Sequence, residues 1–231
     1  WRLRWLLAAA VAAALLPLHT AQQPRYEDVT AAVLGFNAGD VQGAQEALEE
    51  LAMSETDPAS QAEALGVLGV IYSNDGQYER AKAVMDQSLA LDYTVGIVCN
   101  QIEILRRLGR AAEGIALGES VNYSNPDPEN HNCLVNLALA YKELDNLDAA
   151  IKAFEEANAE FPGSMSVLPR LGQLYMQAEK YKEAYEIWQE KEKLDAADGR
   201  ELALDTASGL AMSMHKLGYI YDAEDYYLKA L

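Results

Sequence analysis

The amino-acid sequence predicts an all-α fold, in which about six helix-turn-helix repeats occupy residues 25–231. Three observations lead to this prediction. Apolar residues recur in two stripes at helical spacing, and the pair of stripes repeats with a period of about 34 residues. One position in the second stripe holds Ala or Gly in every copy. A chain that is 50% hydrophobic has the composition of a folded protein rather than a disordered one.

The repeats are expected at six places along the chain, and the first residue of each copy is counted as position 1. They lie near 25–58, 62–95, 95–128, 131–164, 165–198 and 204–231. Positions 4, 7, 8 and 11 form the apolar stripe of a first helix, and positions 17, 20, 24 and 27 form that of a second. Gly76 and Gly109 stand between the stripes, where a helix ends and the chain turns.

Small residues at positions 8 and 20 predict close packing of the two helices in a repeat. Without a large side chain at these positions the two backbones approach each other, and larger neighbours fill the surrounding space. Position 20 is occupied in the six copies by Ala44, Ala81, Gly114, Ala150, Ala184 and Ala223. The copy at 95–128 fits less well, because Gln101 stands where the other copies place an apolar residue.

We interpret the recurring tyrosines and the paired acidic residues as structural rather than catalytic. Tyr72, Tyr141 and Tyr175 occupy position 11, so we expect them to pack in the core. Acidic pairs such as Glu49–Glu50 and Glu155–Glu156 are typical of solvated helix faces. Replacing Glu155 by Ala is therefore expected to leave stability almost unchanged.

The spacing resembles the tetratricopeptide repeat family, whose unit is a helix-turn-helix of about 34 residues. The residues that carry the resemblance are clearest in the copy at 131–164. They are Leu134, Leu137, Ala138, Tyr141, Leu147, Ala150, Phe154, Ala157 and Pro162. The resemblance implies a right-handed superhelical solenoid and a non-catalytic scaffold that binds a peptide or protein partner in a concave groove. The last copy is truncated at Leu231 within its second helix, so we expect the chain to be a fragment.

The resemblance also implies that positions 2, 5, 6, 9, 12 and 13 of the first helices face the groove. In three successive copies position 6 carries Asn or Arg, which could bind the backbone or a carboxylate of an extended peptide. Positions 12 and 13 add positive charge to a chain whose net charge is -18. The alternative is that these side chains only solubilise an unused face. The candidate partner-binding residues are Asn100, Arg106, Arg107, Asn136, Lys142 and Arg170.

The N-terminal segment differs from the rest of the chain. Arg2 and Arg4 precede the uncharged run WLLAAAVAAALLPL, residues 5–18. This run is shorter than the roughly 20 residues that span a membrane and fits the core of a signal peptide. We therefore expect residues 1–21 to be a signal peptide and the protein to be exported, periplasmic or extracellular. The alternative is a membrane anchor formed by residues 5–18.

Motifs of catalytic, metal and nucleotide sites are absent from the sequence, including H-E-x-x-H, G-x-S-x-G, G-x-G-x-x-G and the phosphate-binding loop. We therefore expect no enzymatic activity, no cofactor and no metal, and nothing indicates a small-molecule substrate. The net charge of -18 opposes binding to nucleic acid. The alternative is the repeat portion of a larger exported enzyme, or of an envelope assembly factor, with another domain beyond Leu231.

The two cysteines, Cys99 and Cys133, lie at similar places on the first helices of adjacent copies. Packed helices lie about 8 to 10 Å apart, whereas a disulfide needs Cα atoms within about 7 Å. The spacing favours two small packed side chains, and a disulfide is the alternative.

Overall fold

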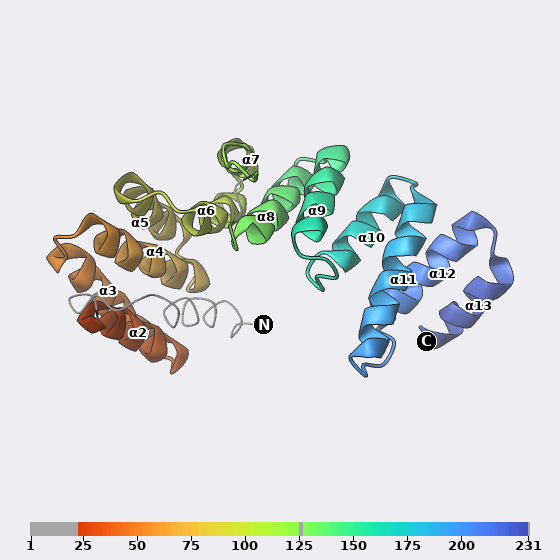
Figure 1. The fold of residues 1–231 in the computed structure, drawn as a ribbon, viewed down its shortest axis with the longest axis horizontal. Coiled ribbons are helices and arrows are strands. Elements are labelled where there is room, and N and C mark those ends of the chain that lie inside the picture. The colour runs from red at the N-terminus through yellow and green to blue at the C-terminus, as the bar shows by residue number, and fades with distance from the viewer. Residues whose placement is uncertain (1–22, 125–126, 231) are drawn as a thin grey trace. The chain divides into compact units, whose positions relative to one another are not determined.

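The computed structural model describes residues 23–124 and 127–230, and its regular elements in these ranges are all α-helices (Figure 1). The helices follow one another in pairs. The pairs are α2 (Gln23–Asn37) and α3 (Val41–Ser54), α4 (Pro58–Asn74) and α5 (Tyr78–Leu91), α6 (Val95–Arg107) and α7 (Ala111–Glu119), α8 (Asn130–Glu143) and α9 (Leu147–Glu160), α10 (Leu168–Gln177) and α11 (Tyr181–Ala197), and α12 (Leu204–Leu217) and α13 (Ile220–Lys229). This order confirms the prediction of an all-α helical repeat solenoid. The expected signal peptide or anchor at 1–21 lies outside the described residues.

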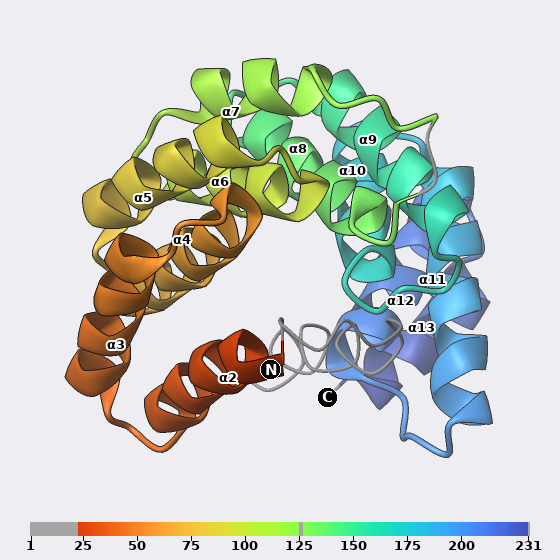
Figure 2. The same cartoon turned by 60° about the vertical axis from the view of Figure 1, so that its left-hand side comes forward.

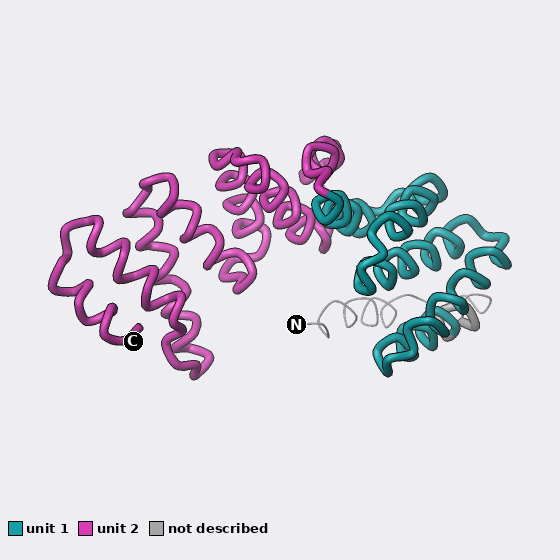
Figure 3. The backbone as a smooth tube through the Cα atoms, turned by 180° about the vertical axis from the view of Figure 1, so that it is seen from behind, with its two compact units in different colours: residues 1–108 teal, residues 109–231 magenta. Residues whose placement is uncertain are grey.

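The chain divides into two compact units, residues 1–108 and 109–231 (Figure 3). In unit 1 each helix from α2 to α6 contacts the next, as the views in Figures 1 and 2 show, and the first helices α2, α4 and α6 also contact in turn. In unit 2 each helix from α7 to α13 contacts the next, and α10 contacts α12. Each unit is thus a stack in which a helix packs on its sequence neighbours.

One residue with a left-handed backbone separates the two helices of each pair. The six residues all stand at position 15, and they are Gly39, Gly76, Gly109, Asp145, Glu179 and Gly218, with φ between 55° and 98°. In five of the six turns the N–H of the next residue donates to the carbonyl at position 11, as from Gln77 to Tyr72 at 2.8 Å, which is a Schellman helix ending. Glycine adopts this conformation without strain, which explains its use at four of the six turns.

Small residues set the approach of the helices within a pair. All six residues predicted at position 20 are buried. A Cβ added to Gly69 would lie 2.6 Å from Cγ of Met85, so α4 and α5 approach too closely for any side chain there. In unit 2, Trp188 on α11 is only 2% exposed, and added Cβ atoms at Gly172 on α10 and Gly209 on α12 would lie 2.6 Å and 2.3 Å from its Cε2. The indole is therefore enclosed by two glycine-lined helix surfaces.

Polar contacts join each first helix to the second helix that precedes it. The acid at position 25 accepts a hydrogen bond from the tyrosine hydroxyl at position 11 of the next copy, and the bond from Tyr175 to Oε1 of Glu155 is 2.5 Å long. The other two bonds of this kind join Tyr72 to Glu49 and Tyr141 to Glu119. Between α5 and α6, Asp86 accepts instead from the side-chain amide of Gln101, which is buried. We call these four contacts the position-25 clamps.

The clamps add to two interpretations. Glu155 is exposed and Glu49 is half-buried, so both reach solvent as expected, but each also accepts a hydrogen bond from a tyrosine of the next first helix. Tyr72 and Tyr175 are buried as expected, at 1% and 8% exposed, but they also make a polar contact that packing alone does not require. Gln101, which departs from the apolar pattern, has its partner in Asp86.

The cysteines also differ from the favoured interpretation. Cys99 and Cys133 are buried, and both are disulfide-bonded rather than free thiols. The spacing of about 8 to 10 Å applies to helix axes, whereas the limit of about 7 Å for a disulfide applies to Cα atoms, which lie about 2.3 Å from the axis. Comparing these two distances therefore did not exclude a bridge.

Candidate functional site on the first helices

On α6 in unit 1, the three candidate residues differ in their surroundings. Asn100 and Arg106 are half-buried, and Arg107 is exposed. The guanidinium of Arg107 lies 3.3 Å from Oε1 of Glu103, one helical turn earlier, and both side chains reach solvent. An exposed pair of this kind contributes little to stability, so Arg107 can exchange this partner for another carboxylate at small cost.

In unit 2, Asn136 and Lys142 lie on α8 and Arg170 lies on α10. Asn136 and Arg170 are half-buried, and Lys142 is exposed. The guanidinium of Arg170 donates to the carbonyl of Ser166 in the preceding turn. This bond holds the Arg170 side chain along its own helix.

Helical periodicity orders these residues on the helix surface. A separation of seven residues returns almost to the same face, whereas six residues differ by about 120°. Asn100 therefore shares its edge of α6 with Arg107, and Arg106 lies at the opposite edge. On α8, likewise, Asn136 and Lys142 border a face about 120° wide.

The middle of that face belongs to position 9, which sequence reasoning about charge passed over. In unit 2 this position holds Leu139, Gln173 and Met212. Gln173 is exposed and Met212 is 45% exposed, whereas Leu139 is half-buried. A helical-wheel projection of the first helices could have found them. The face in unit 2 is thus apolar or uncharged along its middle and polar along its edges.

Three of the tyrosines with a raised pKa, Tyr72, Tyr141 and Tyr175, lie at the position-25 clamps. Burial and the hydrogen bond to Glu49 raise the pKa of Tyr72 to about 12. Burial and Glu119 raise the pKa of Tyr141 to about 12 in the same way. These hydroxyls keep their protons at neutral pH, so they serve as hydrogen-bond donors and not as general bases.

In the part of the chain that the structure describes, neither a cluster of metal-ligand side chains nor a membrane-spanning helix is found. No three His, Cys, Asp or Glu side chains of these residues come together as a metal site. None of the helices between residues 23 and 230 combines the length and apolar character that crossing a membrane requires.

A shallow hollow of about 480 Å³ in unit 1 is lined mainly by Ala and Gly of α2 and α3.

Comparison with known proteins identifies two repeats in the sequence and several solved structures with the same fold. Residues 62–94 and 131–159 match the tetratricopeptide repeat model. No curated protein sequence matches the chain. Among solved structures, PilF of Pseudomonas aeruginosa is 19% identical with a TM-score of 0.72, and each chain is covered over 90% of its length.

Two further solved structures share the fold. PilW, described as a widely conserved type IV pilus biogenesis factor, is 17% identical with a TM-score of 0.70, and 92% of this chain and 93% of PilW are covered. MamA of Desulfovibrio magneticus is 20% identical with a TM-score of 0.62, and the likeness covers 78% of this chain and 98% of MamA. At these identities the likeness establishes the fold.

Proposed function

We propose that this chain, in which residues 62–94 and 131–159 match the tetratricopeptide repeat, is a non-catalytic scaffold that binds an extended peptide segment of a partner protein on the face of its first helices. The observation that carries the proposal is the composition of that face in unit 2. Leu139 and Met212 offer apolar contact along the middle. Asn136, Lys142 and Arg170 offer hydrogen bonds and positive charge at the edges.

The chemistry of these edges suggests what the peptide presents. The side-chain amide of Asn136 both donates and accepts, which suits a peptide backbone. A guanidinium such as that of Arg170 binds a carboxylate with two parallel hydrogen bonds. The partner segment would therefore place an acidic side chain or its own C-terminal carboxylate near Arg170 and an apolar side chain near Met212.

A binding experiment tests the proposal. The affinity of a purified partner, first captured by cross-linking in the source cells, is compared between the wild type and the double variant Asn136→Ala/Arg170→Ala. Lys152→Ala/Lys182→Ala is the matched control, since these lysines lie on second helices and are both 78% exposed. We expect the first variant to bind at least about tenfold more weakly. Unchanged affinity would overturn the assignment of this face.

Export to the periplasm or cell exterior, and a role in envelope assembly, form a second candidate. It draws support from the predicted N-terminal signal and from the likeness to PilW and PilF over at least 90% of each chain. In the source organism, N-terminal sequencing of the fractionated protein would separate a processed form from one retained at the membrane. Surface pili that persist unchanged after deletion of the gene would argue against the assembly role.

A further inference from the structure

The junction between α11 and α12 departs from the other junctions within the two units. Its position 25 is Gln189 and the next position 11 is Met214, so the residue types of the position-25 clamps are missing. The amide of Gln189 donates instead to the hydroxyl of Tyr185 on its own helix. Another contact must therefore supply the polar part of this junction.

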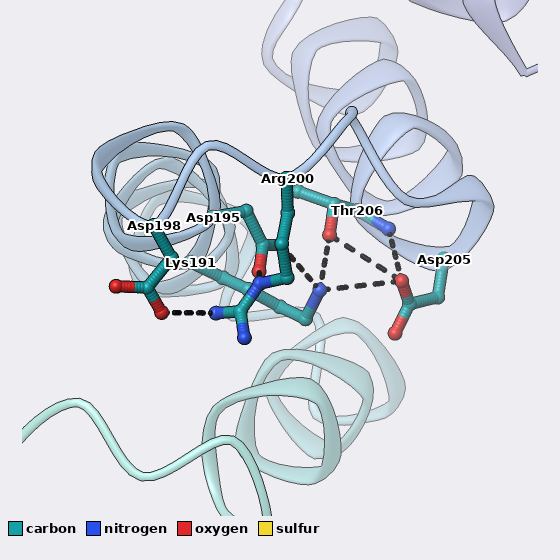
Figure 4. A network of polar contacts seen from close by, with 6 residues as sticks. All are labelled: Lys191, Asp195, Asp198, Arg200, Asp205 and Thr206. Atoms are coloured by element: carbon teal, nitrogen blue, oxygen red, sulfur yellow. Dashed lines mark hydrogen bonds and ion pairs between the residues drawn. The ribbon is translucent and has the colours of Figure 1, made fainter.

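That contact is a network of charged and polar groups, shown in Figure 4, whose centre is buried and is formed by Lys191, Asp195 and Thr206. Lys191 on α11 is 5% exposed, and its Nζ donates to Oδ2 of Asp195 at 2.9 Å and to Oγ1 of Thr206 on α12 at 2.6 Å. The same Nζ lies 3.4 Å from Oδ1 of Asp205. Arg200, in the connecting segment, donates from Nε to the other oxygen of Asp195 at 2.9 Å. We call these five residues the Lys191 cluster.

The spacing of the repeats explains why a lysine stands here. Position 27, which is Lys191 in this copy, holds Leu51, Ser88, Val121 and Ala157 in earlier copies. This copy is followed by the next after 39 residues, from 165 to 204, whereas the preceding interval, from 131 to 165, is 34. The extra residues extend α11 to 17 residues, against 14 for α9. In the cluster, Lys191 reaches Asp205 and Thr206 in the first turn of α12.

We propose that the Lys191 cluster is a conformational lock that fixes where the α12–α13 pair docks on α11. The apolar part of this junction, Trp188 against Gly209, lacks direction because dispersion and hydrophobic contact tolerate sliding. Buried charges in contrast require their partners at one geometry, since a displaced partner leaves a charge uncompensated. Loss of the cluster releases α12 and α13 together and leaves α8 and α9 in place.

Hydrogen–deuterium exchange of the whole chain, read peptide by peptide, tests the lock. In Lys191→Met we expect the amides of α12 and α13 to exchange about a hundredfold faster, because the buried Asp195 loses one of its two cationic partners and keeps only Arg200. The amides of α8 and α9 are expected to exchange at the wild-type rate. Lys193→Met is the matched control, since Lys193 is exposed on the same helix, and it should match the wild type throughout. Equal acceleration over α8–α13, or none, would overturn the proposal.

A second pair of variants separates positioning from simple stabilisation. Lys191→Met/Asp195→Leu replaces the ion pair by apolar side chains, which often restores stability. We expect its melting temperature to return towards the wild type while α12 still exchanges faster. Wild-type exchange in α12 of this variant would show that the lock is dispensable.

Thr206→Val keeps the shape of a residue that is 0% exposed and removes only its hydroxyl. If Lys191→Met does not fold, this variant decides the question. Loss of the two hydrogen bonds that this hydroxyl makes, one accepted from Lys191 and one donated to Asp205, should speed exchange in α12 and α13 by about tenfold or more. Exchange at the wild-type rate would contradict the lock in the same way.

Discussion

Replacing Glu155 by Ala removes the acceptor of the Tyr175 hydroxyl, which lies 2.5 Å from Oε1 of Glu155. The sequence alone presented Glu155 as a solvated residue whose loss should be neutral. In the structure its partner Tyr175 is only 8% exposed, so the variant leaves a hydroxyl with little access to water. The change therefore acts on the junction between α9 and α10.

The expected magnitude follows from the kind of bond. Hydrogen bonds to charged groups contribute about 1.5 to 3 kcal/mol, and the exposure of Glu155 to solvent places this one near the lower end, at about 1 to 2 kcal/mol. For a chain of this size each 1 kcal/mol shifts the melting temperature by about 2 to 4 °C. We thus expect Glu155→Ala to melt about 2 to 8 °C below the wild type.

The neighbouring residue provides the control. Glu156 is also exposed and lies 3.6 Å from Nζ of Lys152, which is 78% exposed, so Glu156→Ala should cost no more than about 0.5 kcal/mol. Thermal denaturation of both variants, repeated in a Tyr175→Phe background, isolates the bond. Glu155→Ala should cost almost nothing further in that background. Equal melting of the two single variants, or an undiminished effect of Glu155→Ala in the Tyr175→Phe background, would refute the reasoning.

Three further predictions concern stability. Gly209→Ala should lower the free energy of unfolding by about 1 to 3 kcal/mol in urea titrations, because its Cβ would meet Trp188, whereas Gly35→Ala, with no atom within 4 Å, should raise it by about 0.5 to 1 kcal/mol. If both changes act alike, the packing account is wrong. Glu179→Gly should raise the free energy of unfolding by about 0.5 to 1 kcal/mol, because glycine adopts the left-handed backbone at φ 57° without the strain that a side chain causes. A loss of stability would contradict this prediction. Burial raises the pKa of Tyr72 to about 12 in the folded protein, whereas a tyrosine in the unfolded chain titrates near about 10. The free energy of unfolding should therefore fall as the pH rises from about 10 through 12, and it should fall less in Tyr72→Phe. Urea midpoints at about pH 9 and pH 11 check this, and equal losses in the two proteins would be inconsistent with it.

The helices could be predicted from the sequence because their determinants are local. Residues such as Ala81 and Ala150 recur at position 20 with the period of the repeat, and both are 0% exposed. The turns are equally local, since Gly76 and Gly109 mark the left-handed residue by their chemistry. Asp145 and Glu179 adopt the same conformation without that signal, so their role became visible only from the backbone.

The clamps could not be predicted in the same way, because each joins residues that already have a sufficient local explanation. Tyr72 is 23 residues from Glu49, and Tyr175 is 20 residues from Glu155. A tyrosine in an apolar stripe and a glutamate on a polar face fit their own helices without reference to each other. Their pairing depends on how one repeat packs on the next, which the periodicity of a single repeat does not contain. The same reasoning applies to Lys191, which a sequence pattern would assign to solvent.

Some residues of the candidate site were proposed from the sequence, and others became apparent only from helix geometry. The resemblance implies which positions would face a partner, and the residue types at position 6 can form hydrogen bonds, so Asn136 and Arg170 were proposed from the sequence. The apolar middle of the face depends on the angular order of residues around a helix. Met212 therefore emerges from geometry, because by composition it is one methionine among six.

The polar contacts distinguish one junction between neighbouring repeats from another. Position 20 is Ala or Gly in all six copies, so close packing within a repeat hardly distinguishes one copy from another. The junctions do differ, since Glu155 accepts from Tyr175 whereas Gln189 is followed by Met214 and the Lys191 cluster. A first helix that carries a tyrosine at position 11 would find no acid if it followed α11. Apolar packing thus explains why each pair of helices forms, and the polar contacts explain how a first helix is positioned on the second helix that precedes it.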